Sequence, residues 1–179
     1  MKTTDLCDKY GEQLRVAEPI GFRSFGGRAA FYGQVETVQC LEDNTFVRAT
    51  LEKDGTGKVL VVDGDGSNRC ALLGDNIAEL AHKNGWNGMI VFGYIRDLVA
   101  VSGIDIGVLA LGTNPKKSAK DNLGMTNLTV RFADIDFVPG EFVYVDEDGV
   151  VVSDRELVLP QRNQTIRPDR FAPREPDAL

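Results

Sequence analysis

The segment from residue 58 to residue 97, KVLVVDGDGSNRCALLGDNIAELAHKNGWNGMIVFGYIRD, contains the alternation that decides the fold. Its first five residues, 58–62, form a run that is continuously apolar after Lys58, which is typical of a strand covered on both faces. The acidic and glycine-rich residues 63–66 end that run. Residues 76–84 then predict a helix, and residues 89–92 predict a second buried strand. A strand, a helix and a strand in this order predict a parallel βαβ unit.

Outward from this segment, further elements extend the same pattern. Upstream we expect a helix over 4–10, a strand over 31–38 and a helix that Asp43 caps and Gly55 ends; downstream we expect a strand over 106–111. Closely spaced strands follow at 128–132, 135–138 and 142–145, and Asp148-Gly149 predicts a hairpin into 150–152. The predicted fold class is therefore α/β, with a parallel βα core plus an antiparallel β layer. It forms one domain over residues 1–159, and a Pro- and Arg-rich tail follows over 160–179.

Composition narrows the class of protein. The chain has 179 residues, 42% of them hydrophobic, and a formal net charge of −7, which fits one domain with a substantial core. The acidic balance argues against direct nucleic-acid binding, which needs a basic patch. No apolar run approaches the roughly 20 residues of a membrane span, and the N-terminus has no apolar signal region. We therefore expect a cytoplasmic protein without a membrane partner.

The metal-binding side chains restrict the cofactor. Cys7, Cys40 and Cys70 are far apart and form no C-x-x-C pair, so buried reduced thiols are expected. His82 is the single histidine, which excludes sites that need two histidines from one chain. A metal would then be held mostly by oxygen, which favours Mg²⁺ or Mn²⁺.

Two short stretches carry the candidate chemistry. Gly74-Asp75-Asn76-Ile77 lies where a loop enters a helix, and free N–H groups at a helix start bind anions. An ordinary helix start, with a capping box formed by Asn76 and Glu79, is the alternative. Arg96-Asp97 ends the stretch 91–97, where a strand runs out into a loop, and it offers a carboxylate-binding fork beside a metal-binding oxygen. A surface ion pair is the alternative there. Ligands of open α/β sheets bind beyond the carboxyl ends of strands, which favours the site.

Residues 63–67, Asp-Gly-Asp-Gly-Ser, carry a second possible signal. They resemble the D-x-D-G-T/S start of haloacid-dehalogenase phosphatases, in which the first aspartate is the nucleophile. Those enzymes need a second acidic cluster well downstream, and the only Gly-Asp candidate here comes too early, at Asp75. A glycine-rich turn that shapes a pocket floor is the alternative interpretation.

Several motifs together resemble one family, which joins the regulator of ribonuclease activity A to the 4-hydroxy-4-methyl-2-oxoglutarate aldolases (RraA-like). The likeness runs from about Thr4 to Ser153. Its aldolase branch carries an aspartate, then twenty residues, then Arg-Asp, and this chain keeps that pattern as Asp75, Arg96 and Asp97. The remaining matches are at 25–28, 61–76, 85–88, 93–97, 139–141 and 146–150.

The resemblance implies a fold, an activity and a site. It implies a swivelling β/β/α-type domain that assembles as a homotrimer or a hexamer. It also implies a metal-dependent aldolase that cleaves 4-hydroxy-4-methyl-2-oxoglutarate to pyruvate and decarboxylates oxaloacetate through the same pyruvate enolate. Asp97 would reach the metal, Arg96 and the backbone of residues 74–77 (Gly74, Asp75, Asn76 and Ile77) would bind the 2-oxo acid, and Asp75 would position a water for proton transfer. One further acid would come from a neighbouring subunit. The alternative is a non-catalytic regulator that binds and inhibits ribonuclease E.

Overall fold

The computed structural model describes residues 1–159, and the predicted tail at 160–179 lies outside the described residues. Four helices and one 3₁₀ turn alternate with twelve strands along this part of the chain. The helical elements are α1 Thr3–Tyr10, η1 Gly11–Gln13, α2 Thr45–Leu51, α3 Asp75–Lys83 and α4 Leu98–Ser102. The strands are β1 Arg15–Val16, β2 Arg23–Ser24, β3 Phe31–Gln39, β4 Lys58–Asp63, β5 Ala71–Leu73, β6 Gly88–Ile95, β7 Gly107–Thr113, β8 Met125–Thr126, β9 Val130–Phe132, β10 Ile135–Phe137, β11 Phe142–Asp146 and β12 Gly149–Ser153.

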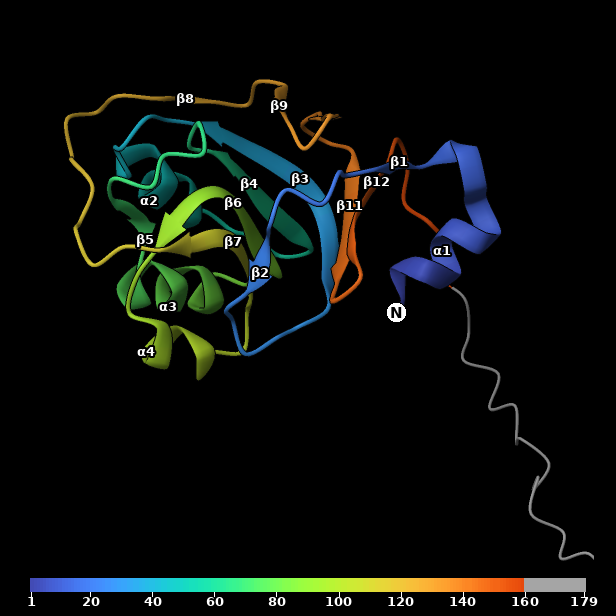
Figure 1. Cartoon of the computed structure of the whole chain (residues 1–179), viewed down its shortest axis with the longest axis horizontal. Coiled ribbons are helices and arrows are strands. Elements are labelled where there is room, and N and C mark those ends of the chain that lie inside the picture. The colour runs from blue at the N-terminus through green and yellow to red at the C-terminus, as the bar shows by residue number, and fades with distance from the viewer. Residues whose placement is uncertain (160–179) are drawn as a thin grey trace, which may run out of the picture.

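One large mixed sheet organises the molecule (Figure 1). Its central strands β3, β4, β6 and β7 are parallel, and each is joined to the next through a segment that contains a helix. The antiparallel strands β11, β12 and β1 continue the same sheet beyond β3, while β9 and β10 form a separate two-stranded ribbon. The predicted α/β class, with a parallel core and an antiparallel part, is confirmed.

Both faces of the parallel strands are covered, as the apolar run at 58–62 predicts. Along β4, Leu60 and Val62 belong to the core under α2, α3 and α4. Val59 and Val61 point the other way, into a second core shared with β9, β10 and β11. All four side chains are fully buried. Since successive residues of a strand face opposite sides, only a strand buried on both faces needs an unbroken apolar run.

The N-terminal helix belongs to a third, smaller core on the far side of the antiparallel strands. Leu6 packs there with Tyr144 and Val151. The buried Asp146 carboxylate accepts hydrogen bonds from both the backbone nitrogen and the hydroxyl of Thr3, each 2.6 Å long. Two short charge-assisted bonds therefore fix the first residue of α1 against β11.

The prediction of buried thiols holds for two of the three cysteines. All three thiols are free; Cys40 and Cys70 are buried, and Cys7 is partly buried. Burial, followed by the nearby carboxylates of Asp43 and Asp63, raises the pKa of the Cys40 thiol to about 12. A thiol with so high a pKa is protonated at neutral pH and unreactive. Cys40 therefore serves as a small core residue.

Candidate active site

The two predicted ends of the site meet because β5 pairs in parallel with β6. Leu73 lies opposite Ile95, and the Arg96 backbone nitrogen donates to the Leu73 carbonyl at 2.9 Å. Gly74 and Arg96 therefore leave adjacent strands at the same edge of the sheet. This is the carboxyl edge, where ligands of open α/β sheets bind.

The Asp97 carboxylate packs against the backbone of Gly74. A Cβ placed on Gly74 would lie 2.5 Å from Asp97 Oδ2 and 3.2 Å from Arg96 Cγ. The Gly74 φ of −142° is open to any residue, so glycine is needed here for space. Asp97 Oδ2 is also 3.2 Å from Arg96 Nε. The side chains of Arg96 and Asp97, which follow β6, thus pack together against the loop that precedes α3.

Asp97 has a left-handed backbone, with φ 61° and ψ 42°, just before α4. Its carbonyl accepts the first hydrogen bond of that helix, from Val101 at 3.0 Å. A residue other than glycine in this conformation is uncommon, although aspartate and asparagine tolerate it better than most. The carboxylate side chain is 38% exposed. The fold therefore holds a strained, solvent-accessible carboxylate beside Arg96.

The first turn of α3 differs from the predicted capping box. The helix starts at Asp75, so its N-cap is Gly74, which has no side chain to accept a bond. Glu79 pairs with Lys83 instead of reaching back. Asp75 Oδ1 accepts from the Asn76 backbone nitrogen at 2.7 Å and from Asn76 Nδ2 at 2.9 Å. The capping-box prediction is wrong, because the N-cap is Gly74, two residues before the Asn76 that the pattern indicates.

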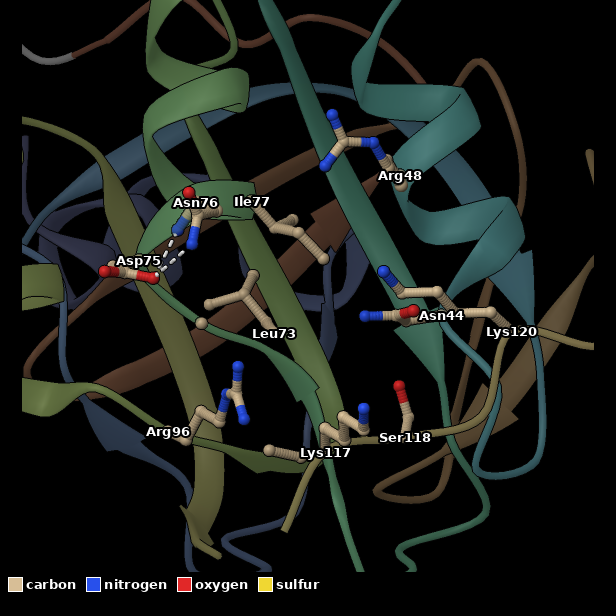
Figure 2. Close-up of a pocket in the computed structure, with 12 residues that line it drawn as sticks. Asn44, Arg48, Leu73, Asp75, Asn76, Ile77, Arg96, Lys117, Ser118 and Lys120 are labelled. Carbon is tan, nitrogen blue, oxygen red and sulfur yellow. Dashed lines mark hydrogen bonds between the residues drawn. The ribbon is translucent and has the colours of Figure 1, made fainter. Parts of the chain in front are cut away.

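A cavity of about 210 Å³ opens over this edge of the sheet (Figure 2). Five of the predicted residues line it: Gly74, Asp75, Asn76, Ile77 and Arg96. Asp97 does not line the cavity and lies beside it, behind Gly74 and Arg96. The volume is below the roughly 300–1,000 Å³ of sites for drug-sized ligands, so it suits a small metabolite.

The opposite wall of the cavity was missed from the sequence. Arg48 comes from α2, and Lys117, Ser118 and Lys120 come from the loop after β7. Figure 2 shows Lys117 and Lys120 on this wall, across the cavity from Asp75 and Asn76. The edge rule could have indicated Lys117, Ser118 and Lys120, because residues 114–120 follow a parallel strand, but it could not have indicated Arg48 on α2.

The cavity is cationic in an acidic protein. Four cationic side chains line it, namely Arg48, Arg96, Lys117 and Lys120, against the single carboxylate of Asp75. The whole chain carries 20 basic and 27 acidic residues. A concave surface with one sign of charge concentrates ligands of the opposite sign. The charges that line the cavity therefore favour an anionic ligand.

The acidic turn at 63–66 serves a structural purpose. Asp63 Oδ1 accepts from the Asp65 backbone nitrogen at 3.0 Å, and its Oδ2 accepts from Gln39 at 3.1 Å. None of residues 63–67 lines the cavity beside Arg96, so the predicted pocket floor is not found there. His82 lies exposed on α3, and Trp86 is buried in the core.

Two features are not seen within residues 1–159: a cluster of metal-binding side chains and a membrane-spanning helix. No three His, Cys, Asp or Glu side chains come together there in a group that could hold a metal ion. Within the same residues, no helix combines the length and apolar character needed to cross a membrane.

Comparison with known proteins places these features in one family. Residues 3–152 match the RraA-like family model, described as Aldolase/RraA. A "Putative 4-hydroxy-4-methyl-2-oxoglutarate aldolase" of Pseudomonas fluorescens is 50% identical over 159 residues, which are 89% of this chain and 97% of that protein.

Two solved structures are also similar. The RNA-processing inhibitor RraA from Thermus thermophilis is 43% identical with a TM-score of 0.84, covering 92% of this chain and 97% of that one. A protein from Geobacillus kaustophilus described as an S-adenosylmethionine: 2-dimethylmenaquinone methyltransferase is 46% identical with a TM-score of 0.86, covering 88% and 97%. The three names differ, so the chemistry of the cavity has to decide among them.

Proposed function

Since the chain belongs to the RraA-like family, we propose that it is a divalent-metal-dependent aldolase that cleaves 4-hydroxy-4-methyl-2-oxoglutarate and related 4-hydroxy-2-oxo acids to pyruvate. The same site would decarboxylate oxaloacetate. The observation that supports this proposal is the packing of Arg96 and Asp97 against Gly74, beside a small cationic cavity. The name of the Pseudomonas relative agrees with it.

The residues present fit a hard divalent cation. Asp97 supplies a solvent-accessible carboxylate beside the cavity, next to Arg96, and Mg²⁺ is commonly held through one or two carboxylates while it keeps several waters. A group of three protein ligands is absent from residues 1–159, which suits Mg²⁺ better than a metal that needs a full protein cage. Asp97 would hold the cation. When bound, the cation would act as a Lewis acid toward the negative charge that develops on the 2-keto oxygen.

The remaining residues would bind and orient the 2-oxo acid. Arg96 would donate charge-assisted hydrogen bonds to its C1 carboxylate or to the developing oxyanion. Backbone N–H groups at the start of α3, between Gly74 and Ile77, would donate to the same carboxylate, apart from the Asn76 N–H, which donates to Asp75 Oδ1. These groups would bind the negative charge of the C1 carboxylate. The reaction then needs no lysine that forms a Schiff base with the substrate.

Asp75 would position the water that takes the proton of the C4 hydroxyl. A water held by its carboxylate accepts the proton of the C4 hydroxyl, the C3–C4 bond breaks, and its electron pair forms the enolate of pyruvate. The enolate then takes up a proton at C3, and the other fragment leaves as a second pyruvate. With oxaloacetate the same bond breaks to release CO₂ and leave the same enolate. One arrangement of side chains thus serves both reactions.

The cavity argues against the methyltransferase name. S-adenosylmethionine carries a positively charged sulfonium and an ammonium group. Four cationic side chains around a space of about 210 Å³ would repel it. The same charges attract a small dianion.

Pyruvate release measured with and without Mg²⁺ tests the proposal. Wild-type protein should release pyruvate from both 4-hydroxy-4-methyl-2-oxoglutarate and oxaloacetate, EDTA should abolish release, and added Mg²⁺ should restore it. Asp97→Asn should lower kcat by at least about a hundredfold, because the amide loses the charge that holds the cation while it still tolerates the left-handed backbone.

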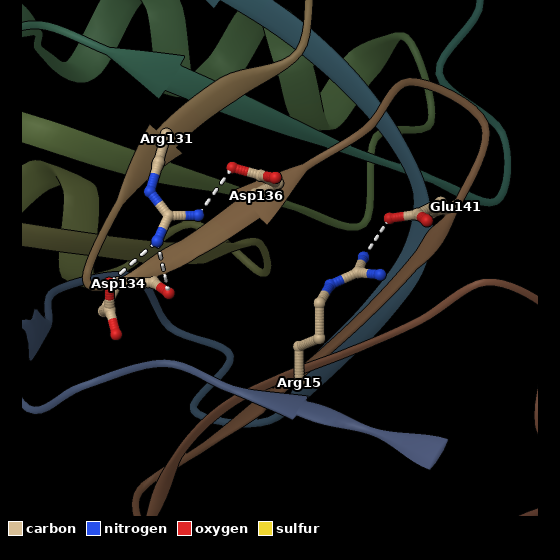
Figure 3. Close-up of polar contacts among 5 residues, drawn as sticks. All are labelled: Arg15, Arg131, Asp134, Asp136 and Glu141. Atoms are coloured by element: carbon tan, nitrogen blue, oxygen red, sulfur yellow. Dashed lines mark hydrogen bonds and ion pairs between the residues drawn. The ribbon is translucent and has the colours of Figure 1, made fainter. Parts of the chain in front are cut away.

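Asp134 offers a matched control on the β9–β10 turn (Figure 3). It too has a positive φ, 57°, and its carboxylate pairs with an arginine, Arg131, at 2.8 Å. Asp134→Asn should therefore leave turnover unchanged. Full turnover after exhaustive chelation, or in Asp97→Asn, would contradict the proposal.

The second candidate function is regulation of ribonuclease E, which the likeness to the Thermus RraA favours. Regulation would use the outer surface of the protein, whereas turnover would need the cavity. A wild-type protein that inhibits ribonuclease E and releases no pyruvate from either acid would favour this candidate over the aldolase.

A further inference from the structure

A second hollow lies over β3, and we call it the β3 pocket. Its volume is about 470 Å³, more than twice the 210 Å³ of the candidate active site, and the two spaces share no lining residue. This volume falls within the roughly 300–1,000 Å³ that is usual for small-molecule sites. No step of the proposed reaction uses the β3 pocket, so a ligand bound there would be separate from the 2-oxo acid.

The β3 pocket opens where β3 changes its antiparallel neighbour. The first four residues of β3 pair with β11, whereas its last two pair with β8. Between these partners, the carbonyls just before and just after Glu36 accept from the Gly140 and Asn127 nitrogens, at 2.9 and 3.0 Å. Gly140 and Asn127 both line the pocket, as do Thr50 and Lys53 from the end of α2. Segments that are far apart in the sequence thus enclose one space.

A buried hydroxyl that lines the β3 pocket has no hydrogen-bond partner in the described structure. Thr50 is only 3% exposed, and its Oγ1 neither donates nor accepts within residues 1–159. An unsatisfied buried polar group costs free energy, so each one calls for an explanation. A ligand oxygen in the pocket would supply the partner that this hydroxyl lacks.

Other polar side chains of the pocket wall are already held in place. Gln34 Nε2 donates to the Gly140 carbonyl at 3.1 Å. Lys58 Nζ donates to Glu36 Oε1 at 2.6 Å. Since the amide oxygen of Gln34 and the second carboxylate oxygen of Glu36 remain, both side chains can still accept from a ligand. The wall therefore presents positioned acceptors to hydroxyl groups.

The charged side chains that line the β3 pocket leave one positive charge in excess. Lys53 and Lys58 are cationic, and Glu36, which pairs with Lys58, is the single carboxylate. Within residues 1–159, Lys53 forms no ion pair. The Lys53 nitrogen donates to the Thr50 carbonyl at 3.1 Å, so the ammonium and the unpartnered hydroxyl come from the same turn. An ammonium and a hydroxyl donor on one wall favour a single anionic group.

We propose that the β3 pocket binds a polyhydroxylated monoanion, of the class that includes the sugar acids. Thr50 and Lys53 would hold its anionic end, and Gln34 and Glu36 would accept hydrogen bonds from its hydroxyl groups. A sugar phosphate carries similar hydroxyl groups with a second negative charge, which the single excess positive charge matches less well. The proposal does not depend on the aldolase chemistry, because the β3 pocket shares no residue with the candidate active site.

Three six-carbon probes separate the two halves of the proposal. Gluconate has a carboxylate and hydroxyl groups, hexanoate keeps only the carboxylate, and sorbitol keeps the hydroxyl groups without the charge. NMR titration of the full-length protein reports the two spaces separately, through the amide signals of Glu36 and Asn127 for the β3 pocket and those of Asn76 and Ile77 for the active site. At Glu36 and Asn127, gluconate should bind at least about fivefold more tightly than either other probe. Equal affinities, or no shift of these two signals, would overturn the proposal.

Two substitutions locate the anionic end. Thr50→Val keeps the shape of the side chain and removes the hydroxyl, so gluconate should bind about threefold more weakly. Stability in urea should stay the same or rise, because the hydroxyl makes no bond within the described protein. Lys53→Met should lower the affinity for gluconate to about that for sorbitol. Variants that bind gluconate as tightly as the wild type would overturn the assignment to Thr50 and Lys53.

Matched controls come from outside the β3 pocket. Ser118 also has a buried hydroxyl without a partner in the described structure, but it lines the candidate active site. Lys83 is an exposed lysine that lines neither space. Ser118→Ala and Lys83→Met should therefore keep the wild-type affinity for gluconate at Glu36 and Asn127. An equal loss in these controls would contradict a site at the β3 pocket.

The two proposals fail in different ways. Gluconate binding in a protein that releases no pyruvate would support the β3 pocket as a site and contradict the aldolase. Pyruvate release without gluconate binding at the β3 pocket would support the aldolase and overturn the second site.

Discussion

At the scale of single residues, Gly74 determines whether the candidate site can form. Its missing side chain leaves the space that the Asp97 carboxylate and the Arg96 side chain occupy. Gly74→Ala should displace both groups. Because displacements of about 1 Å at a reacting centre cost roughly a hundredfold in rate, we expect kcat/KM for pyruvate release to fall by about that factor. Stability in urea should change little, since the backbone at Gly74 has an ordinary φ of −142°.

Gly103→Ala is the control for this substitution. Gly103 follows α4 with a φ of −85°, and a Cβ there would meet its nearest atom at an ordinary 3.5 Å. This variant should keep full turnover. If Gly74→Ala also keeps it, the position of the Asp97 carboxylate cannot matter for the reaction.

Residues along one continuous stretch could be predicted as a site from the sequence, and residues from other elements could not. Gly74 to Ile77 and Arg96 each follow a recognisable change from strand to loop or from loop to helix. Arg48 and Lys117 lie on elements whose arrival at the cavity depends on strand order and helix packing. The edge rule could have indicated the loop after β7, but no local pattern encodes the helix packing that brings Arg48 to the cavity. The sequence therefore predicts the wall at the end of β6 and misses the wall across from it.

At the scale of elements, Asp43 joins α2 to the loop that carries the cavity lysines. The side chain is almost fully buried. Its Oδ1 accepts from the Thr45 nitrogen at 2.8 Å, as a helix cap does, and its Oδ2 accepts from the Asp121 nitrogen at 2.5 Å. The prediction that Asp43 caps α2 is off by one residue, because the N-cap is Asn44, whose side chain makes no capping bond. Asp43 nevertheless accepts from the first residue of the helix, and it makes a second bond to a distant loop that the sequence did not indicate.

Replacing Asp43 should loosen both elements. Asp43→Asn turns one acceptor into a donor that faces a backbone N–H, so we expect a loss of about 1–3 kcal/mol in the free energy of unfolding by urea. Faster exchange of the Asp121 amide hydrogen should accompany it. Asp54→Asn is the control, because Asp54 makes similar bonds to Thr56 on an exposed turn and joins no distant loop. Equal losses in the two variants would mean that the bond to Asp121 contributes nothing.

The difference between wild type and Asp43→Asn should depend on pH in one direction. Burial alone would raise the pKa of Asp43, but hydrogen bonds from Thr45 and Asp121 outweigh it and hold the pKa below its ordinary value of 3.8. An ionised group with a lowered pKa contributes its full stability above pH 3.8, and this contribution is lost as the pH falls through the lower folded value. The difference should therefore be constant at neutral pH and shrink only below about pH 4.

Element length separates what the sequence predicted from what it missed. The long apolar strands and the helix at α3 were predicted to within a few residues. The strands β1, β2 and β8 have two residues each, and α4 has five. Such segments are too short to show a period of 2 or 3.6, and they exist because neighbouring strands or an αL residue hold them. Their positions follow from tertiary contacts alone.

At the scale of the whole molecule, long-range polar contacts join the N-terminal region to the antiparallel end of the sheet. Arg15 of β1 pairs with Glu141 just before β11, as Figure 3 shows. Thr3 bonds to Asp146 at the other end of the same strand. These contacts hold the N-terminal region against β11 and β12. The cavity is lined by residues of α2 and α3, two helices that lie away from α1 in Figure 1.

Apolar side chains remain exposed on the single chain. The segment around β8 carries Leu123, Met125 and Leu128, which are 60%, 53% and 41% exposed, and Val99 on α4 is 91% exposed. Isolated exposed apolar residues are common, whereas three within six positions on one edge segment favour contact with another subunit. Closed cyclic assembly is the usual way to bury such a surface.

We expect a trimer, or a pair of trimers, in which a neighbouring subunit completes each site. Within residues 1–159 one chain brings no group of three metal-binding side chains together, and the family resemblance implies an acid from the neighbour. Sedimentation at micromolar concentration should give about three or six times the chain mass of 19.6 kDa. Specific activity should fall on dilution into the range where the mass falls, and it should recover on concentration, with carrier protein present to exclude loss on surfaces. A monomer with full specific activity would rule out both the assembly and the shared site, because a single subunit would then contain every residue that catalysis needs.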